Sequence, residues 1–208
     1  MTAIEHVEIA AGRLQLRPPS EADAAEALAM LRDPDIAQWN PGPDKLDLDG
    51  VRAWCLRGAD WSDGSHATFA VLDATTGALL GNVSLHEVDH AQQDAEIGYR
   101  TAPWARNRGV AADGVAAVAR WAFAAVGLVR IEIRHAVVNL ASCRVAEKAG
   151  FPCEGTVRQA YVYGDGMRYD DHLHARLSSD PDPDLVSGER ARSVPGSAAA
   201  QGRGQRLG

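Results

Sequence analysis

Alternating apolar and polar residues first appear at Leu14–Arg17, which predicts a short, half-buried strand. Ser20 follows, with acidic residues in the segment Glu21–Asp23, and this order is typical of a helix N-terminus. The helix is expected to reach about Arg32, where Asp33-Pro34 stops it. The first part of the chain therefore predicts a strand followed by a helix.

The middle of the chain predicts a second helix over 47–58 and then paired strands. Residues 68–72 and 79–85 read as a hairpin around the turn residues Ala74–Gly77. A further strand over 95–100 contains Gly98. Glycine inside a strand often marks a bulge or the close approach of a ligand, so Gly98 is a candidate site position.

A long amphipathic helix is predicted after Gly109, with apolar residues at helical spacing through Phe123. The rest of the pattern gives a strand over 129–137, a helix over 142–149, and strands over 154–163 and 172–177. Helices between strands indicate an α+β fold. We expect one domain over 1–178. The segment 179–208 is rich in Pro, Gly, Ser and Ala and is predicted to be a disordered tail.

Charge narrows the classes of partner. The net charge is -7 and the pI is about 5.4, which argues against tight binding of nucleic acid, because such binding needs clustered Lys and Arg. No apolar run approaches the roughly 20 residues of a membrane span, and the first residues lack the order of a secretory signal. We therefore expect a cytoplasmic protein without a nucleic acid or membrane partner, in which an acidic cleft would attract a basic substrate.

Metal-ligand patterns are weak in the sequence. The three cysteines are Cys55, Cys143 and Cys153. They form no CxxC pair, so neither a disulfide framework nor a cysteine-type zinc site is predicted. Two histidine pairs have short spacings, namely His86 with His90 and His172 with His174. No partner in the sequence completes either pair, so they are interpreted as surface or cleft histidines and no metal is expected.

The segment Arg106-x-x-Gly109-x-Ala111 lies between a predicted strand and a long helix. Unpaired amides at a helix N-terminus, with the helix dipole behind them, form an anion site. Gly109 lets the backbone approach a pyrophosphate, and Arg106 and Arg108 add positive charge. Neither GxGxxG nor GxxxxGK[ST] is present, which disfavours dinucleotide and nucleoside-triphosphate sites. The alternative is an ordinary helix start with solvated arginines.

Two longer motifs extend this observation. Arg-Asn-Arg-Gly-Val-Ala at 106–111 resembles the Q/R-x-x-G-x-G/A signature of the GNAT acyltransferases and follows a Glu-Ile-Gly-Tyr strand. The segment 139–151 is similar to the N-x-x-S-x-x-V-x-E-K-x-G-F motif of the branch that contains ribosomal-protein N-terminal acetyltransferases. The resemblance covers about residues 10–178. It implies the GNAT fold, a mixed sheet with a splayed strand flanked by helices.

The resemblance also implies direct acetyl transfer from acetyl-CoA, the co-substrate, to a primary amine. It assigns residues to the cofactor in three groups. The loop that binds the pyrophosphate comprises Arg106, Asn107, Arg108, Gly109, Val110 and Ala111. The strand beside the pantetheine arm supplies Ile97, Gly98 and Tyr99, and the pantetheine and thioester sulfur meet Asn139 and Ser142. Asn107 replaces a glycine that is common in the family, but Asn tolerates left-handed backbone.

Acyl transfer to an amine needs a base for the ammonium and a proton donor for the leaving thiolate. Glu96 lies ten residues before Arg106, where related enzymes carry their base; a strand-end charge is the alternative. Many relatives have a tyrosine seven residues after the motif asparagine as the acid, but this chain has Ala146. The resemblance to this branch implies a serine that protonates or hydrogen-bonds the thiolate, so Ser142 is the candidate acid, and it also suits a helix cap. The candidate acceptor-side residues are His86, Glu87, Trp39 and Tyr161, with His86 and Glu87 as substitutes for the base.

Several alternatives stay open at this stage. The acceptor is either a protein N-terminus or a small-molecule amine, and the length of the acyl chain is not fixed by these motifs. Tyr161 occupies a place where ribosomal-protein members carry a carboxylate, which leaves the acceptor and the base unsettled. A homodimer is common in the family. The competing function is a non-catalytic, regulatory domain that binds acyl-CoA.

Overall fold

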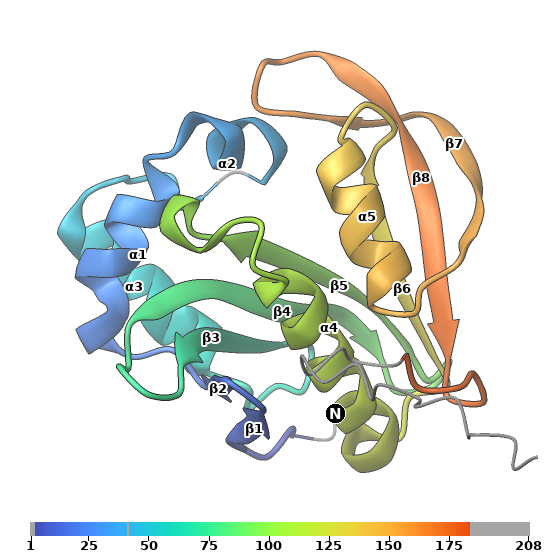
Figure 1. The fold of residues 1–208 in the computed structure, drawn as a ribbon, viewed down its shortest axis with the longest axis horizontal. Helices are drawn as coiled ribbons and strands as arrows, with labels where there is room; N and C mark the ends of the chain where they lie inside the picture. Colours follow the sequence, from blue (N-terminus) through green and yellow to red (C-terminus); the bar gives the residue numbers. More distant parts are fainter. Residues whose placement is uncertain (1–2, 41, 184–208) are drawn as a thin grey trace, which may run out of the picture.

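The computed structural model describes residues 3–40 and 42–183 of the 208-residue chain. Within them, one sheet has the strand order β1-β2-β3-β4-β5-β6-β8-β7 (Figure 1). The strands are β1 (Ile9–Ala11), β2 (Leu14–Arg17), β3 (Ala67–Asp73), β4 (Leu79–Asp89), β5 (Asp94–Thr101), β6 (Arg130–Ala136), β7 (Cys153–Val162) and β8 (Arg168–Leu177). Neighbouring strands are antiparallel except β5 and β6, which are parallel. This mixed sheet confirms the predicted fold class.

Helices cover both faces of the sheet. They are α1 (Ala24–Leu31), α2 (Pro34–Trp39), α3 (Leu48–Ala59), α4 (Val110–Trp121) and α5 (Leu140–Lys148), with short turns η1 (Glu21–Asp23), η2 (Pro103–Ala105) and the π-helical η3 (Ala122–Val126). Gly58 of α3 packs against Thr68, whereas Gly114 of α4 packs against Val71 and Val83. Side chains alternate between faces along a strand, so α3 and α4 lie on opposite faces of β3 and β4.

The parallel pair β5–β6 separates partway along its length. Pairing runs only from Asp94↔Arg130 to Glu96↔Glu132. Beyond Glu96, β5 stays paired with β4 to Thr101, while β6 stays paired with β8. The two strands therefore diverge after Glu96, which confirms the splayed strand that the resemblance implied and leaves a row of backbone groups on β5 without a strand partner on that side.

Most predicted elements are present, and two were missed. The three-residue strand β1 was not predicted. Helix α2 begins where the sequence predicted only a stop: Asp33 is its N-cap and accepts a hydrogen bond from the Ile36 amide at 3.1 Å, and Pro34 occupies the first turn. Asp33-Pro34 thus ends α1 and starts α2, because a proline that cannot continue one helix is well suited to the first turn of the next.

The long helix α4 ends in a π-helical turn that a left-handed glycine closes. After α4 the chain makes the π-helical turn η3, and Gly127 follows in the left-handed region with φ 82°. Its amide donates to the Ala122 carbonyl at 3.1 Å, which satisfies a carbonyl at the helix end. The buried aromatic side chains Trp61 and Phe69 pack beside the partly buried Trp121, at centroid distances of 4.8 to 5.9 Å. This packing fixes the axis of α4 on the sheet.

The end of the described chain still contacts the domain. Arg176, which is buried, pairs with Asp182 at 2.6 Å, and Gly150 lies against Pro183. These contacts extend past the boundary predicted at residue 178. The remainder of the predicted tail, 184–208, lies outside the described residues. Among the helices that are described, none combines the length and apolar character that crossing a membrane requires.

Candidate active site

A cleft of about 1210 Å³ lies between the diverging strands. It extends from the start of α4, along β5 and α5, to the side chains of α2 and β7. Of the site residues predicted from sequence, those that line it are Trp39, His86, Glu87, Glu96, Ile97, Gly98, Tyr99, Arg106, Asn107, Gly109, Val110, Ala111, Asn139, Ser142 and Tyr161. The lining does not include Arg108. The structure therefore brings together residues that are more than 100 positions apart in the sequence.

The loop before α4 has the backbone of an anion site. Gly109 is the N-cap, with φ 76°, and Asn107 has φ 59°, so the two left-handed residues curl the loop around the helix start. The side chain of Asn107 is compatible with this conformation, as the sequence predicted. The first amides of a helix have no partner within it, so those that begin α4 are available to an anion at the cleft, with the helix dipole behind them.

The arginines of this loop are placed differently from the expectation. The Arg106 guanidinium pairs with Asp33 and, at 3.1 Å, with Asp35, both on the start of α2. Arg108 is exposed, and its carbonyl accepts a hydrogen bond from Arg13. Arg106 and Arg108 therefore hold the loop to its neighbours or face solvent in this structure.

Two further cations line the cleft from α5. Arg144 and Lys148 lie one helical turn apart and both face the cleft. Sequence reasoning assigned neither of them. The available signal was their helical spacing from Leu140 in the same motif, because a helix that presents a residue of its first turn to a ligand also presents positions one and two turns later along the same side.

The N-terminus of α5 holds a short hydrogen-bonded group. The Asn139 side chain accepts a bond from the Ser142 amide at 3.1 Å and caps the helix. The Ser142 hydroxyl lies 2.6 Å from the phenolic oxygen of Tyr99, which also lies 3.1 Å from the Ser142 carbonyl. Burial raises the pKa of Tyr99, so the phenol stays protonated at neutral pH. Ser142 is therefore both part of a capped turn and the partner of a buried phenol.

Glu96 lies where β5 and β6 separate, between two cations. One of its carboxylate oxygens is 3.7 Å from Nε2 of His86, and the other is 3.7 Å from Nε of Arg134. Burial lowers the pKa of His86, but the Glu96 carboxylate, the Ser84 carbonyl and Glu87 outweigh it, and the net pKa is raised. At a pH below this raised pKa, His86 is protonated beside Glu96 and has no lone pair for a further proton, so within the pair only the carboxylate can accept one.

Gly98 is explained by its neighbour on β4. A Cβ at Gly98 would lie 3.2 Å from the His86 ring, so glycine leaves room for the imidazole to reach Glu96. The irregular register lies on β4 between His86 and Asp89, where Glu87 has φ 52°. The sequence suggested either a bulge or the close approach of a ligand at Gly98. The structure shows no bulge at this residue, and it shows the close approach of the His86 side chain.

Aromatic side chains form one wall at the far end of the cleft. Trp39 of α2 makes edge contacts with Tyr163 and Tyr169, at centroid distances of 5.4 and 5.7 Å. Tyr161, which is 53% exposed, packs at 5.1 Å from Tyr163. These contacts join α2 to the hairpin β7–β8, so elements that are far apart in the sequence meet above the splayed strands (Figure 1).

A buried carboxylate also lines this end of the cleft and was not assigned from the sequence. Asp171 accepts a hydrogen bond from the Tyr163 hydroxyl at 3.0 Å. Burial raises the pKa of Asp171, and the nearby charge of Glu96 adds to the increase. Two carboxyl groups with different environments therefore share one cleft, an arrangement that is common where proton transfer occurs.

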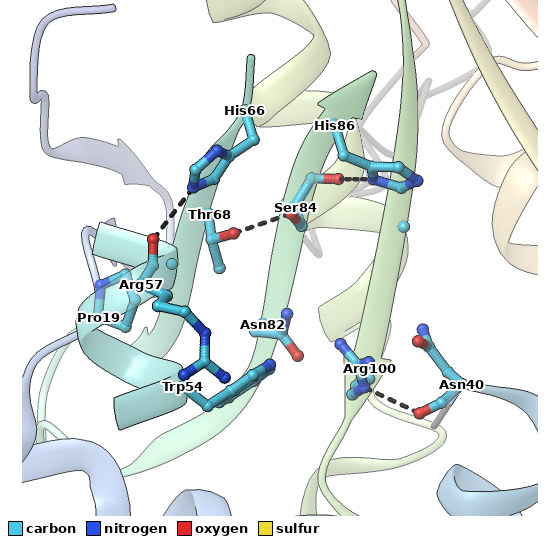
Figure 2. Close-up of a pocket in the computed structure, with 12 residues that line it drawn as sticks. Pro19, Asn40, Trp54, Arg57, His66, Thr68, Asn82, Ser84, His86 and Arg100 are labelled. Atoms are coloured by element: carbon cyan, nitrogen blue, oxygen red, sulfur yellow. Dashed lines mark hydrogen bonds between the residues drawn. The ribbon is translucent and has the colours of Figure 1, made fainter. Parts of the chain in front are cut away.

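A second pocket, of about 350 Å³, adjoins the cleft (Figure 2). Both cavities are lined by Asn40, His86, Gly98 and Arg100. The second pocket continues between α3 and strands β3 and β4, and Figure 2 shows Asn82 between Trp54 and Arg100. Asn82 is only 5% exposed, and neither its amide nitrogen nor its carbonyl oxygen has a partner. Buried polar atoms without partners are costly, which makes them good indicators of a ligand.

The histidine pairs differ from the sequence interpretation in one respect. His90 contacts the Gly64 carbonyl at 3.0 Å while His86 faces Glu96, so the first pair does not converge. In the second pair His174 is fully buried, and its prediction as a surface or cleft residue was wrong. The reason is non-local: β8 lies between β6 and β7 in the sheet, and His174 faces α5.

The cysteine beside Ser142 has the environment of a protonated thiol. Burial raises the pKa of the Cys143 thiol, and the charge of Glu147 adds to the increase. A thiolate, not a thiol, is the nucleophile in covalent catalysis. Cys143 is therefore a poor candidate for an acyl-enzyme.

Taken together, a sheet that splays beside a helix N-terminus, with a carboxylate where the strands separate and a hydroxyl at the start of α5, defines the acyl-CoA-dependent N-acyltransferase class of fold and site. A family model described as "Acetyltransferase (GNAT) domain" matches residues 13–152. The chain belongs to this family. The match includes the predicted phosphate loop and the whole of α5.

Individual relatives agree with the family. The uncharacterized N-acetyltransferase YoaA of Bacillus subtilis is 35% identical over 100 residues, which is 48% of this chain and 56% of that protein. Across three such curated relatives, the matched segment spans only 51 to 62% of their own length.

Solved structures match the fold over more of the chain. A ribosomal-protein-S5-alanine acetyltransferase from Vibrio fischeri has a TM-score of 0.72 at 20% identity, covering 84% of this chain and 98% of that one. Spermidine N-acetyltransferase from Vibrio cholerae, in complex with CoA and spermine, has a TM-score of 0.69 at 23% identity, covering 80% and 96%. One fold thus accommodates enzymes named for protein and for polyamine acceptors, so the fold by itself does not identify an acceptor.

Proposed function

We propose that this protein is an acetyl-CoA-dependent N-acetyltransferase that transfers an acetyl group directly to a primary amine. The observation that carries this proposal is the single cleft that joins three features: the left-handed loop before α4, the Tyr99–Ser142 hydrogen bond, and the carboxylate of Glu96. Each feature suits one part of the reaction, and their order along the cleft matches the order of donor phosphates, thioester and acceptor amine.

The donor occupies the side of the cleft that includes α4 and α5. Amides of Gly109, Val110 and Ala111 bind the pyrophosphate, and Arg144 and Lys148 balance its charge. The β5–β6 pairing ends at Glu96, so the backbone of Ile97 and Gly98 can hydrogen-bond the amides of the pantetheine arm as a strand would. This places the thioester beside Ser142.

Transfer then needs three proton movements. Glu96, through a water molecule, removes a proton from the acceptor ammonium, and the neutral amine attacks the thioester carbonyl. The C–N bond forms, the C–S bond breaks, Ser142 donates a proton to the departing thiolate, and Ser142 regains a proton from the nitrogen of the new amide. Tyr99 donates a hydrogen bond to the Ser142 oxygen and stabilises it as that proton leaves. The products are an amide, free CoA and one proton.

The acceptor enters from the side of the second pocket. Its amine meets Glu96 and His86, and the adjoining part of the molecule occupies the space beside Asn82, Arg57 and Arg100. Guanidinium and amide groups suit carbonyl or carboxylate oxygens, whereas a polyamine would bring further positive charge beside the two arginines. We therefore propose a peptide N-terminus as the acceptor. Trp39 and Tyr161 form the wall along which its later residues lie.

The remaining parts of the proposal follow from the reaction. Acetyl-CoA is available in the cytoplasm, and we therefore also propose a cytoplasmic location for this protein. The transfer has no step that requires a metal. A regulatory domain that only binds acyl-CoA would keep the phosphate loop but would need neither Glu96 nor Ser142.

The test combines binding and turnover. Calorimetric titration measures the affinity for acetyl-CoA, and release of the CoA thiol measures transfer to a panel of tripeptides, spermidine and free amino acids, with succinyl-CoA as the donor control. We expect the wild type to bind acetyl-CoA and to acetylate tripeptides. Glu96→Gln should reduce this turnover about a hundredfold without changing the affinity for acetyl-CoA. Binding without turnover on any amine would support the regulatory domain. Turnover with spermidine alone would refute the peptide acceptor, and absence of binding would refute the whole proposal.

A further inference from the structure

Three histidines and a cysteine converge beside the cleft. They are His135 on β6, His172 and His174 on β8, and Cys143 on α5. One ligand atom from each side chain lies within 4.8 Å of the corresponding atoms of the other three. The cluster depends on strand pairing: His135 lies opposite His172 in the β6–β8 register, and His174 follows two residues later on the same face.

Hydrogen bonds fix the tautomers of the two buried rings. Nδ1 of His135 lies 2.9 Å from the Ala136 carbonyl, and Nδ1 of His174 lies 2.9 Å from the Phe151 carbonyl. A carbonyl only accepts, so each Nδ1 carries the proton and donates it. In the neutral rings both Nε2 atoms then present lone pairs.

These lone pairs face each other. Nε2 of His135 lies 3.2 Å from Nε2 of His174, in a place where both rings are almost completely buried. Two acceptors at this distance form no bond unless a proton or a cation lies between them. A metal ion satisfies both nitrogens without protonating either ring.

The other two residues complete a set of four. Nδ1 of His172 is buried and has no hydrogen-bond partner. Sγ of Cys143 lies 3.9 Å from Nε2 of His174. Tetrahedral zinc would place two nitrogens about 3.4 Å apart and a nitrogen and a sulfur about 3.6 Å apart, from bond lengths of about 2.05 and 2.3 Å. The observed separations are close to these edges, and the half-buried His172 and Cys143 can adjust more than the two buried rings.

We propose that His135, His172, His174 and Cys143 form a binding site for a divalent transition metal ion, with Zn²⁺ as the ion that this mixed imidazole and thiolate set suits. Binding replaces the Cys143 thiol proton, which passes to solvent, by a sulfur–metal bond. The carbonyls of Ala136 and Phe151 orient two of the ligating rings, as second-layer acceptors do in known metal sites.

The site has a structural consequence near the cleft. Cys143 is adjacent to Ser142, so an ion on this cluster would tie the first turn of α5 to β6 and β8. Nothing in the family match indicates a metal for acetyl transfer. The ion is therefore expected to stabilise the fold around α5, and this inference does not rest on the proposed function.

The experiment uses the untagged full-length protein after removal of metals with a chelator. Co²⁺ is the probe, because tetrahedral Co²⁺ gives strong visible bands and a thiolate ligand adds a charge-transfer band in the near ultraviolet. We expect both signals to saturate at one Co²⁺ per chain and to disappear on addition of Zn²⁺. We also expect Zn²⁺ to raise the melting temperature of the protein.

Variants assign the ligands. Cys143→Ser is expected to remove the charge-transfer band, and His172→Gln to weaken Co²⁺ binding about tenfold or more. Cys153→Ser is the matched control, since Cys153 is an exposed thiol outside the cluster, and it should retain both signals. Far-ultraviolet circular dichroism verifies that each variant is folded. The site is refuted if the wild type shows no tetrahedral bands, or if the bands persist unchanged in both Cys143→Ser and His172→Gln.

Discussion

The phenolic oxygen of Tyr99 lies 2.6 Å from the hydroxyl oxygen of Ser142, so a residue of β5 supports the first turn of α5 across the cleft. Many GNAT enzymes carry a tyrosine on the helix itself, where this chain has the buried Ala146. Here a tyrosine approaches the first turn of the helix, one turn before Ala146, from the opposite wall. The proton donor in our proposal is therefore a pair of hydroxyl groups and not a single side chain.

This pair predicts non-additive kinetics. Ser142→Ala should lower kcat about a hundredfold, the lower end of the range for a lost proton donor, and Tyr99→Phe should lower it less. The double variant should be no slower than Ser142→Ala, because Tyr99 acts through Ser142. Thiol-release kinetics at saturating acetyl-CoA measure all three. Tyr169→Phe, which removes an exposed hydroxyl bound to Asp165, is the matched control and should leave kcat unchanged. Additive losses in the double variant would contradict the relay.

The ion pair of His86 with Glu96 predicts a pH effect. Because the pKa of His86 is raised, the ring stays protonated above its ordinary pKa of 6.5 and loses its proton as the pH rises through the higher folded value. Glu96→Gln removes the carboxylate that opposes the effect of burial, so the pKa of His86 should fall in the variant. Nuclear magnetic resonance titration of the His86 ring measures this change.

Glu154→Gln is the control for this titration. It also removes one carboxylate, but on β7 beside Arg130, and it should leave the His86 titration where it is in the wild type. An unchanged pKa of His86 in Glu96→Gln would show that the two side chains are not paired in solution. In that case the assignment of Glu96 as proton acceptor would lose its electrostatic support.

The phosphate loop predicts a selective loss of binding. Gly109 has φ 76° at the start of α4, and Gly109→Glu would place a strained backbone and a negative charge where the pyrophosphate binds. Acetyl-CoA affinity should fall below detection in calorimetry. Gly77→Glu is the matched control, since Gly77 has φ 73° in the β3–β4 turn with open space around it. It carries the same strain and charge, so equal losses of affinity in both variants would indicate a general effect on folding and refute the assignment of the loop.

Local pattern was sufficient for most of the fold. Alternation at Leu14–Arg17 and the helical period after Gly109 each describe an element that buries one face, and both elements are present. The missed strand β1 has three residues, too few to show a period. Helix α2 has six, and the signals at Asp33 and Pro34 serve equally as the end of one helix and the start of another.

The residues of the candidate site also differ in whether a local sequence pattern could identify them. Most residues of the loop 106–111, together with Asn139 and Ser142 at a helix start, were predicted from sequence and line the cleft, whereas Arg108 does not line it and Arg144 and Lys148, which do, were not assigned. Asp171 was missed because it reaches the cleft only through the pairing of Ala136 with Asp171 between β6 and β8. The cluster around His135 and His172 depends on the same pairing. Positions that meet only through sheet register carry no local signal, so a single sequence does not reveal them.

The second pocket predicts a change in acceptor affinity that is separate from stability. Asn82 is buried with both side-chain polar atoms unpartnered, so in the free protein it has the cost of desolvation without compensating hydrogen bonds. Asn82→Leu removes that cost with a side chain of the same branched shape, whose larger volume the adjoining pocket can accommodate, and the melting temperature should stay the same or rise. The same change removes two groups that bind the acceptor, so KM for a peptide should increase about 5- to 150-fold, from two hydrogen bonds at roughly 0.5 to 1.5 kcal/mol each.

Ser84→Ala separates this prediction from a general effect on the pocket. The Ser84 hydroxyl is already bonded to Thr68 at 2.8 Å, so its loss should change the peptide KM less than the loss of Asn82 does. The affinity for acetyl-CoA should be unchanged in both variants, because neither residue lines the main cleft. Steady-state kinetics with a tripeptide, together with thermal melting, measure the two effects. If Asn82→Leu lowers stability and leaves KM unaltered, Asn82 supports the fold and the acceptor binds elsewhere. The reason is that a polar group that hydrogen-bonds the acceptor cannot be replaced by an apolar one without a loss of affinity.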